Sequence, residues 1–190
     1  TFLNVQQLNL STATGLRVGA GLFDALTSTP EQVATLTGVP GVVTTEAATL
    51  GGMGLLTNGD LSIDGGLLTV DQSLLVDAQG GHLLLNGAHL RVPGGTAVLT
   101  GASTQLQNAE VNVSAAAAPA GRVVIESTGN TQLAGSTVLQ AEGERGGGVD
   151  VLGQTVTLAD QTALLASGGA GGGQVRIGGD YQGGNPQVRN

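Results

Sequence analysis

Three stretches near the end of the chain repeat at a fixed spacing of 26 residues. Residues 123–125 (Val-Val-Ile) are followed by 149–151 (Val-Asp-Val) and by 175–177 (Val-Arg-Ile). Each stretch follows a glycine corner, at Gly121, at 146–148 and at 171–173. Short strands separated by glycine at such a period are typical of a solenoid, in which residues one period apart stack on each other.

The middle of the chain shows a shorter form of the same pattern. From Asp60 onward, short apolar runs recur every six to seven residues, so that three of them make one three-sided coil of about 20 residues. From Gly95 the longer period holds, because Gly121 lies one step further along the chain. We therefore expect coils that grow from about 20 to 26 residues through longer turns.

The composition suits a narrow tube filled by small aliphatic side chains. Of the 190 residues, 34 are glycine, 40% are hydrophobic and only 2% are aromatic. A compact core of this length would ordinarily use more large rings. The apolar share is too high for a disordered chain, which lacks the apolar surface to offset its ordering entropy.

Charge and cysteine content exclude several classes of function. The net charge is −8, and the six basic residues are all arginine and form no cluster, which argues against a nucleic-acid binder. Cysteine is absent, which excludes disulfides and thiolate chemistry. The sequence has no apolar run long enough for a membrane-spanning helix.

These patterns predict an all-β fold, a right-handed parallel β-helix with three sides. Its crossovers are the other two sides of each coil, and the handedness follows the general bias of parallel connections. Regular solenoid is expected over residues 55–190, and irregular first coils over residues 1–54 within one continuous domain. A short inserted helix is expected near residues 30–37, with a capping box at Thr29 and Gln32, Pro30 at its first position and Gly38 after its end.

Strand alternation predicts which side chains fill the tube. Val149 and Val151 should point inward and Asp150 outward. The same register places Val123, Ile125, Val175 and Ile177 in the inward columns and leaves Val124 exposed. Asp150 and Arg176 should be exposed neighbours across one coil step, an ion pair worth at most about 1 kcal/mol.

Two groups of residues could suggest metal binding, and their spacing argues against it. Asp64, Asp71 and Asp77 fall on three different corners, roughly 15 Å apart, so we expect each to cap its own turn. His82 and His89 lie on separate strands at a spacing that is not typical of metal ligands. We expect both histidines at surface or turn positions.

Acidic and basic residues show no catalytic pattern. The candidates are Asp150 with Arg176, and Glu142 with Glu144 and Arg145, but neither group has a second partner in stacking register. We predict no catalytic, cofactor-binding or metal-binding residue, no cofactor, and no pocket lined by acids at the roughly 5–9 Å separation of glycosidases.

The stretch from Gly172 to Gly183 (GGQVRIGGDYQG) resembles a signature of filamentous-haemagglutinin-like adhesins, which bacteria export by two-partner secretion. The turn 166–168 (Ala-Ser-Gly) before it and the stretch 147–153 fit the same family pattern, and the resemblance covers roughly residues 120–184. Residues 185–189 depart from it. The signature residues, which are structural and form no site, are Gly178, Gly179, Asp180, Tyr181, Gln182 and Gly183.

The resemblance implies a right-handed parallel β-helix and a role in adhesion or matrix scaffolding outside a Gram-negative cell. It implies passage through an outer-membrane secretion pore, host-surface or matrix glycans or proteins as partners, and no catalytic residues. We therefore expect a non-enzymatic stalk and presented surface. Alternatives are a β-helical polysaccharide lyase or hydrolase, and a filament subunit whose copies stack end to end.

The ends of the chain carry an expectation of their own. Leu3 already begins a strand-like run, and the run after Val175 begins a coil that the last residues do not complete. Because exposed strand edges template pairing with other chains, we expect the stack to be continued by the parent chain or by another copy.

Overall fold

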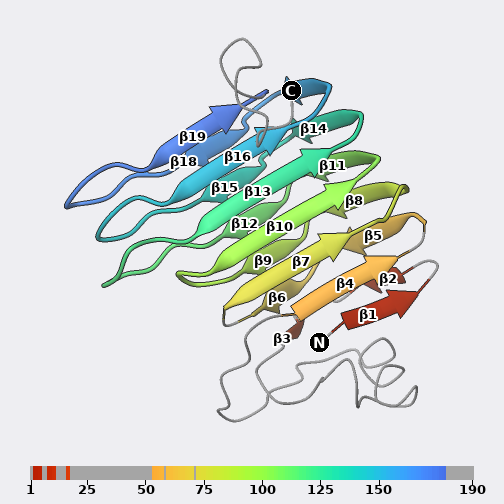
Figure 1. The fold of residues 1–190 in the computed structure, drawn as a ribbon, viewed down its shortest axis with the longest axis horizontal. Helices are drawn as coiled ribbons and strands as arrows, with labels where there is room; N and C mark the ends of the chain where they lie inside the picture. The colour runs from red at the N-terminus through yellow and green to blue at the C-terminus, as the bar shows by residue number, and fades with distance from the viewer. Residues whose placement is uncertain are drawn as a thin grey trace.

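The computed structural model of the protein describes residues 2–5, 8–11, 16–17, 53–57, 59–70 and 72–178. Over these ranges the chain winds as a right-handed parallel β-helix with three sides, as predicted (Figure 1). The expected helix near residues 30–37 and the signature residues 179–183 lie outside the described residues.

Each side of the coil is one parallel sheet. Sheet A consists of β1 (Phe2–Val5), β4 (Met53–Thr57), β7 (Ser73–Asp77), β10 (Thr96–Gly101), β13 (Arg122–Ser127), β16 (Gly148–Leu152) and β19 (Gln174–Ile177). Sheet B consists of β2 (Leu8–Ser11), β5 (Leu61–Asp64), β8 (His82–Asn86), β11 (Ser103–Gln107), β14 (Asn130–Ala134) and β17 (Thr155–Leu158). Sheet C consists of β3 (Leu16–Arg17), β6 (Leu67–Thr69), β9 (His89–Arg91), β12 (Glu110–Asn112), β15 (Val138–Gln140) and β18 (Ala163–Leu165).

The strand pairing confirms the predicted register. Val123 pairs with Val149, which pairs with Val175, and Val124 belongs to the outward column that continues through Asp150 and Arg176. Because side chains alternate along a strand, every coil sends the same positions into the tube.

The interior of the tube is a set of aliphatic columns. One column in sheet A runs through Leu55, Val76, Leu99, Ile125 and Val151, all of them at most 1% exposed. Sheets B and C contribute similar columns, so the described core is a stack of small aliphatic layers. This arrangement explains why so few aromatic residues suffice.

The last described coil is less well covered than the ones before it. Val175 and Ile177 stand in the inward columns of Val149 and Val151, as predicted, yet they are 43% and 48% exposed. Among the described residues, no coil follows β19. The register prediction is therefore confirmed, but burial of its last rung is not observed.

The growth in coil length occurs mainly at one corner, the corner that leads from sheet C to sheet A. This corner spans residues 92–95 between β9 and β10, and it spans residues 113–121, 141–147 and 166–173 in the later coils. The three long corners project from the body of the helix (Figure 1). The predicted lengthening through turns is thus confirmed and located.

Glycine closes the base of the four corners from residues 92–95 onward. Gly95, Gly121, Gly147 and Gly173 each donate a backbone hydrogen bond that closes the corner at its base, at 2.7–2.9 Å. A Cβ on any of them would lie closer than 3.0 Å to a carbonyl oxygen of the preceding coil. These positions therefore require glycine for close approach between coils.

The projecting parts of the long corners form a small ladder of their own. Ala115 bridges Gly143, and Gly143 bridges Gly168, in parallel register. The N–H of Ala115 donates to the Glu142 carbonyl at 2.9 Å, and the N–H of Gly143 donates to the Ser167 carbonyl at 3.2 Å. The three corners together make a flange beside sheet C.

Candidate binding surface

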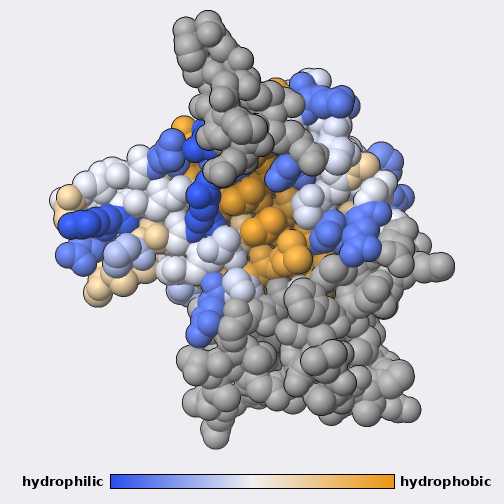
Figure 2. Space-filling view, viewed as in Figure 1, coloured by the Kyte–Doolittle hydropathy of each residue, from blue (hydrophilic) through white to orange (hydrophobic). Residues whose placement is uncertain are grey.

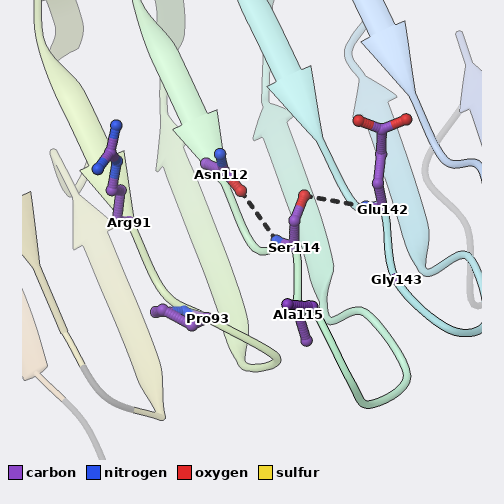
Figure 3. A pocket seen from close by; sticks show the side chains of 8 residues that line it. Arg91, Pro93, Asn112, Ser114, Ala115, Glu142 and Gly143 are labelled. Atoms are coloured by element: carbon purple, nitrogen blue, oxygen red, sulfur yellow. Dashed lines mark hydrogen bonds between the residues drawn. The ribbon is translucent and has the colours of Figure 1, made fainter.

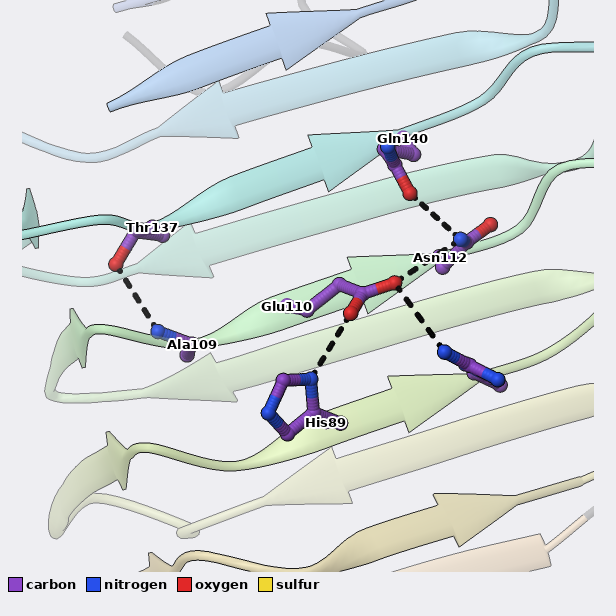
Figure 4. Close-up of polar contacts among 7 residues, drawn as sticks. His89, Ala109, Glu110, Asn112, Thr137 and Gln140 are labelled. Carbon is purple, nitrogen blue, oxygen red and sulfur yellow. Dashed lines mark hydrogen bonds and ion pairs between the residues drawn. The ribbon is translucent and has the colours of Figure 1, made fainter. Parts of the chain in front are cut away.

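A polar network covers part of the outer face of sheet C. Register aligns His89 with Glu110 in neighbouring coils, and it aligns Arg91 with Asn112 and Gln140. The Glu110 carboxylate contacts His89 Nδ1 at 2.9 Å and Arg91 at 4.0 Å. Asn112 Nδ2 donates to Glu110 at 3.1 Å and to Gln140 at 2.6 Å (Figure 4).

These neighbours set the acidity of Glu110. Burial raises the pKa of its carboxyl, but hydrogen bonds with His89 and Asn112 and the charges of Arg91 and His89 outweigh burial. The pKa of Glu110 therefore lies below the ordinary value of 4.5. The carboxylate stays ionised because three polar side chains surround it.

An open groove of about 590 Å³ lies beside this network, in the angle between sheet C and the flange. Its lining side chains come from three successive coils (Figure 3). They are Arg91, Pro93, Asn112, Ser114, Ala115, Ala116, Glu142 and Gly143. Its size falls within the range of ordinary ligand sites.

Hydrogen bonds fix the wall of the groove that the flange supplies. The N–H of Ser114 donates to Asn112 Oδ1 at 2.9 Å, and the N–H of Glu142 donates to Ser114 Oγ at 3.0 Å (Figure 3). The hydroxyl of Ser167 donates to Glu142 Oε1. The groove is therefore held by contacts that run from coil to coil.

A second charged cluster lies on the outer face of sheet A. Arg122 donates to Asp150 Oδ2 through Nε at 2.7 Å, and Arg176 Nε lies 3.6 Å from Asp150 Oδ1. The Arg122 side chain crosses over Gly148, where an added Cβ would lie 3.2 Å from its Cγ. A residue without a side chain at 148 thus allows Arg122 to reach the next coil.

This cluster corrects the expectation of an exposed Asp150–Arg176 pair. The two residues are neighbours across one coil step, as predicted. The Asp150 side chain, however, is only 3% exposed, because Arg122 and Arg176 cover it from both sides. The alternation of side chains along one strand correctly predicted that Asp150 points outward. It could not predict that Arg122, which is not in register with Asp150, also reaches its carboxylate.

An apolar patch occupies the middle of the same face of sheet A (Figure 2). Leu75, Val98 and Val124 form one outward column across β7, β10 and β13, and each is partly exposed. Val124 points outward as predicted, although its neighbours in the column leave it only partly exposed.

Two of the three aspartates singled out in the sequence, Asp64 and Asp77, are described, and they lie on different corners. Asp77 caps its turn by accepting a hydrogen bond from the N–H of Gln79 at 3.0 Å, as predicted. Asp64 does not cap its turn. Its carboxylate accepts hydrogen bonds from Ser62 and from Asn86 in the next coil, and Gly65 and Gly66, both with positive φ, follow it. Asp71 lies outside the described residues.

The two histidines are exposed at the starts of different strands, as predicted. His82 Nδ1 contacts Ser103 Oγ, and His89 contacts Glu110. Glu142 lines the groove, whereas Glu144 and Arg145 lie exposed near the tip of their corner. Of the signature residues, the structure describes Gly178, which has a positive φ of 83° directly after β19.

The sequence reasoning missed the Glu110 network and the role of Arg122. A signal was present, because His89 and Glu110 are 21 residues apart, as are Arg91 and Asn112. Applying the shorter coil period to polar residues would have stacked them. The diagonal reach of Arg122 over Gly148 has no comparable signal, because it depends on a missing side chain between two columns.

Comparisons with protein-family models, with curated proteins and with solved structures give no match to this chain. Within the described ranges, no helix has the length and apolar character that crossing a membrane requires.

Proposed function

We propose that this chain is a rigid β-solenoid segment of a secreted bacterial adhesin or extracellular filament. The observation that carries the proposal is the unbroken stacking of three parallel sheets around one aliphatic core. In such a stack each coil binds its neighbours through backbone ladders, which makes the segment stiff and long for its mass. Its work is to hold and present a surface.

The resemblance of residues 120–184 to filamentous-haemagglutinin-like exoproteins supports an extracellular setting. On this proposal the protein is non-enzymatic, needs no cofactor, and is displayed by a Gram-negative cell after passing through an outer-membrane pore. The walls and the flange then form the surface that meets host or matrix partners.

Surface labelling tests the proposal. Antibodies against the β-helix should bind intact cells of the source bacterium, and external protease should remove the epitope without lysis. Labelling that appears only after permeabilisation would contradict an extracellular role. A cytoplasmic marker protein, probed on the same cells, controls for leakage.

End-to-end stacking of copies is a second candidate role. It is favoured by the large apolar side chains that are exposed on the last described coil, namely Leu158, Val175 and Ile177. Sedimentation across a concentration series should show growing species, and Val175→Asp with Ile177→Asp should reduce them. A concentration-independent monomer would contradict this role.

A further inference from the structure

The groove beside the flange arises from a change in corner length. The corner at residues 92–95 is short, and the next corner, at 113–121, is long. Because of this difference in length, Pro93 of the short corner and Ala115 and Ala116 of the long corner line the groove. The groove crosses successive coils and therefore runs along the solenoid axis.

Opposite charges mark the two ends of the groove. Arg91 belongs to one coil, and Glu142 follows β15 two coils later, so they lie two coil steps apart, about 10 Å along the axis. Both side chains stand at the groove in Figure 3.

Each charged group keeps unused hydrogen-bonding capacity. The Arg91 side chain is 50% exposed, and its one ion-pair contact among the described residues, to Glu110, is long at 4.0 Å. Glu110 is held more closely by His89 and Asn112. Glu142 uses Oε1 to accept from Ser167, and within the described residues Oε2 has no hydrogen-bond partner.

The space between the charges is lined by small groups. Pro93, Ala115 and Ala116 offer apolar surface, and Ser114 and Asn112 offer polar atoms. None of the described lining residues is aromatic, so these residues offer no stacking platform of the kind that favours a sugar. A narrow groove with opposite charges at its ends matches an extended peptide in the polyproline II conformation, whose residues advance about 3.1 Å each.

We propose that this groove binds an extended peptide segment of another protein, with an acidic side chain at Arg91 and a basic side chain at Glu142. A peptide in the polyproline II conformation has three residues per turn and rises about 3.1 Å per residue, so residues three positions apart lie on the same face about 9 Å from each other. The two charged residues of the peptide are therefore three positions apart. The inference deepens the proposed presenting role and rests on it for its biological meaning. The two proposals can fail separately, because surface labelling tests display of the protein and peptide titration tests binding in the groove.

The test is a titration of the purified protein with the blocked tetrapeptide Asp-Ala-Ala-Lys, followed by ligand-observed NMR. We expect saturable binding at about millimolar peptide. Asn-Ala-Ala-Gln serves as the uncharged peptide control, and maltotetraose serves as a neutral sugar. Both should bind at least severalfold more weakly.

Variants of the groove locate the binding. Arg91→Gln and Glu142→Gln should each weaken it about two- to fivefold, the effect of an exposed ion pair. Glu144→Gln and Arg145→Gln, two exposed charges on the same corner as Glu142 but outside the groove, should leave it unchanged. Glu142→Arg should shift preference from Asp-Ala-Ala-Lys to Asp-Ala-Ala-Asp, a gain that misfolding cannot mimic.

Three outcomes would overturn the proposal. They are absence of peptide binding up to about 10 mM, peptide binding that the groove variants leave unchanged, and equal binding of maltotetraose that Glu142→Gln weakens. The last result would assign the groove to a polyhydroxylated ligand. Thermal unfolding of each variant, followed by circular dichroism, establishes that the β-helix is intact.

Discussion

The base and the tip of the long corners obey different constraints. At the base, Gly121 and Gly147 lie against carbonyl oxygens of the preceding coil, and neither has room for a Cβ. Near the tip, Gly169 and Gly172 would place a Cβ in open space. The tips differ in length and sequence, whereas the bases repeat every 26 residues.

The corner bases are needed to build the solenoid, whereas the corner tips make its surface differ from coil to coil. Columns and corner bases must match from coil to coil, because each ladder hydrogen bond needs its partner at one spacing. The corner tips project into solvent, so their length and sequence can vary from coil to coil. The groove lies where this freedom is used, at the step from the corner at 92–95 to the corner at 113–121.

A charge placed in the stacked part should give the largest effect. Val151 is fully buried in the column of Ile125 and Ile177. Val151→Asp should lower the free energy of unfolding by at least about 4 kcal/mol, because an unpaired carboxylate would enter the tube. Ala117→Asp, at an exposed tip, should change it by less than about 0.5 kcal/mol. Urea unfolding followed by circular dichroism measures both changes in the free energy of unfolding. Similar changes for the two variants would contradict the distinction between the stacked part and the tips.

A single added methyl group should also distinguish the base of a corner from its tip. Gly121→Ala should cost about 3 kcal/mol or more, since the new Cβ would meet the backbone of Gly95, which cannot move without loss of the ladder. Gly172→Ala should be close to neutral or slightly stabilising. Melting curves of the two variants provide the measurement. Equal melting temperatures would show that the coils separate easily at their corners.

The stacked part is also the part that the sequence predicts. Gly121, Val149 and Val175 reveal the period because they have counterparts one coil away. The groove has no such signal, since it depends on the difference between two corners. The burial of Asp150 was missed for a related reason: Arg122 reaches it across two columns by passing over Gly148. The repeat period predicts the columns and corner bases, which recur in every coil. The groove lies where the corner length changes between coils, so the period does not predict it.

Loss of the charge on Asp150 should have an intermediate effect. Its carboxylate is buried between Arg122 and Arg176, so Asp150→Asn would leave both arginines without this counter-charge. We expect a loss of about 1–2 kcal/mol, between the values for an exposed and a buried pair, because the Arg122 side chain is 52% exposed and water can hydrate it. Glu144→Gln, the matched change at a corner tip, should cost less than about 0.5 kcal/mol. A loss below about 1 kcal/mol for Asp150→Asn would mean that the pair behaves as an exposed one.

The smallest effect should come from Glu110, and it should depend on pH. The folded state lowers the pKa of this carboxyl below 4.5, so folding favours its ionised form. Its contribution is therefore present above the pKa of the unfolded chain and is lost as the pH falls below about 4.5 through the folded value. Thermal unfolding of the protein and of Glu110→Gln, compared from pH 7 down to pH 3, should show a gap in melting temperature that closes in the acidic range. A gap for Glu110→Gln that widens toward low pH would contradict the assigned direction of the pKa shift.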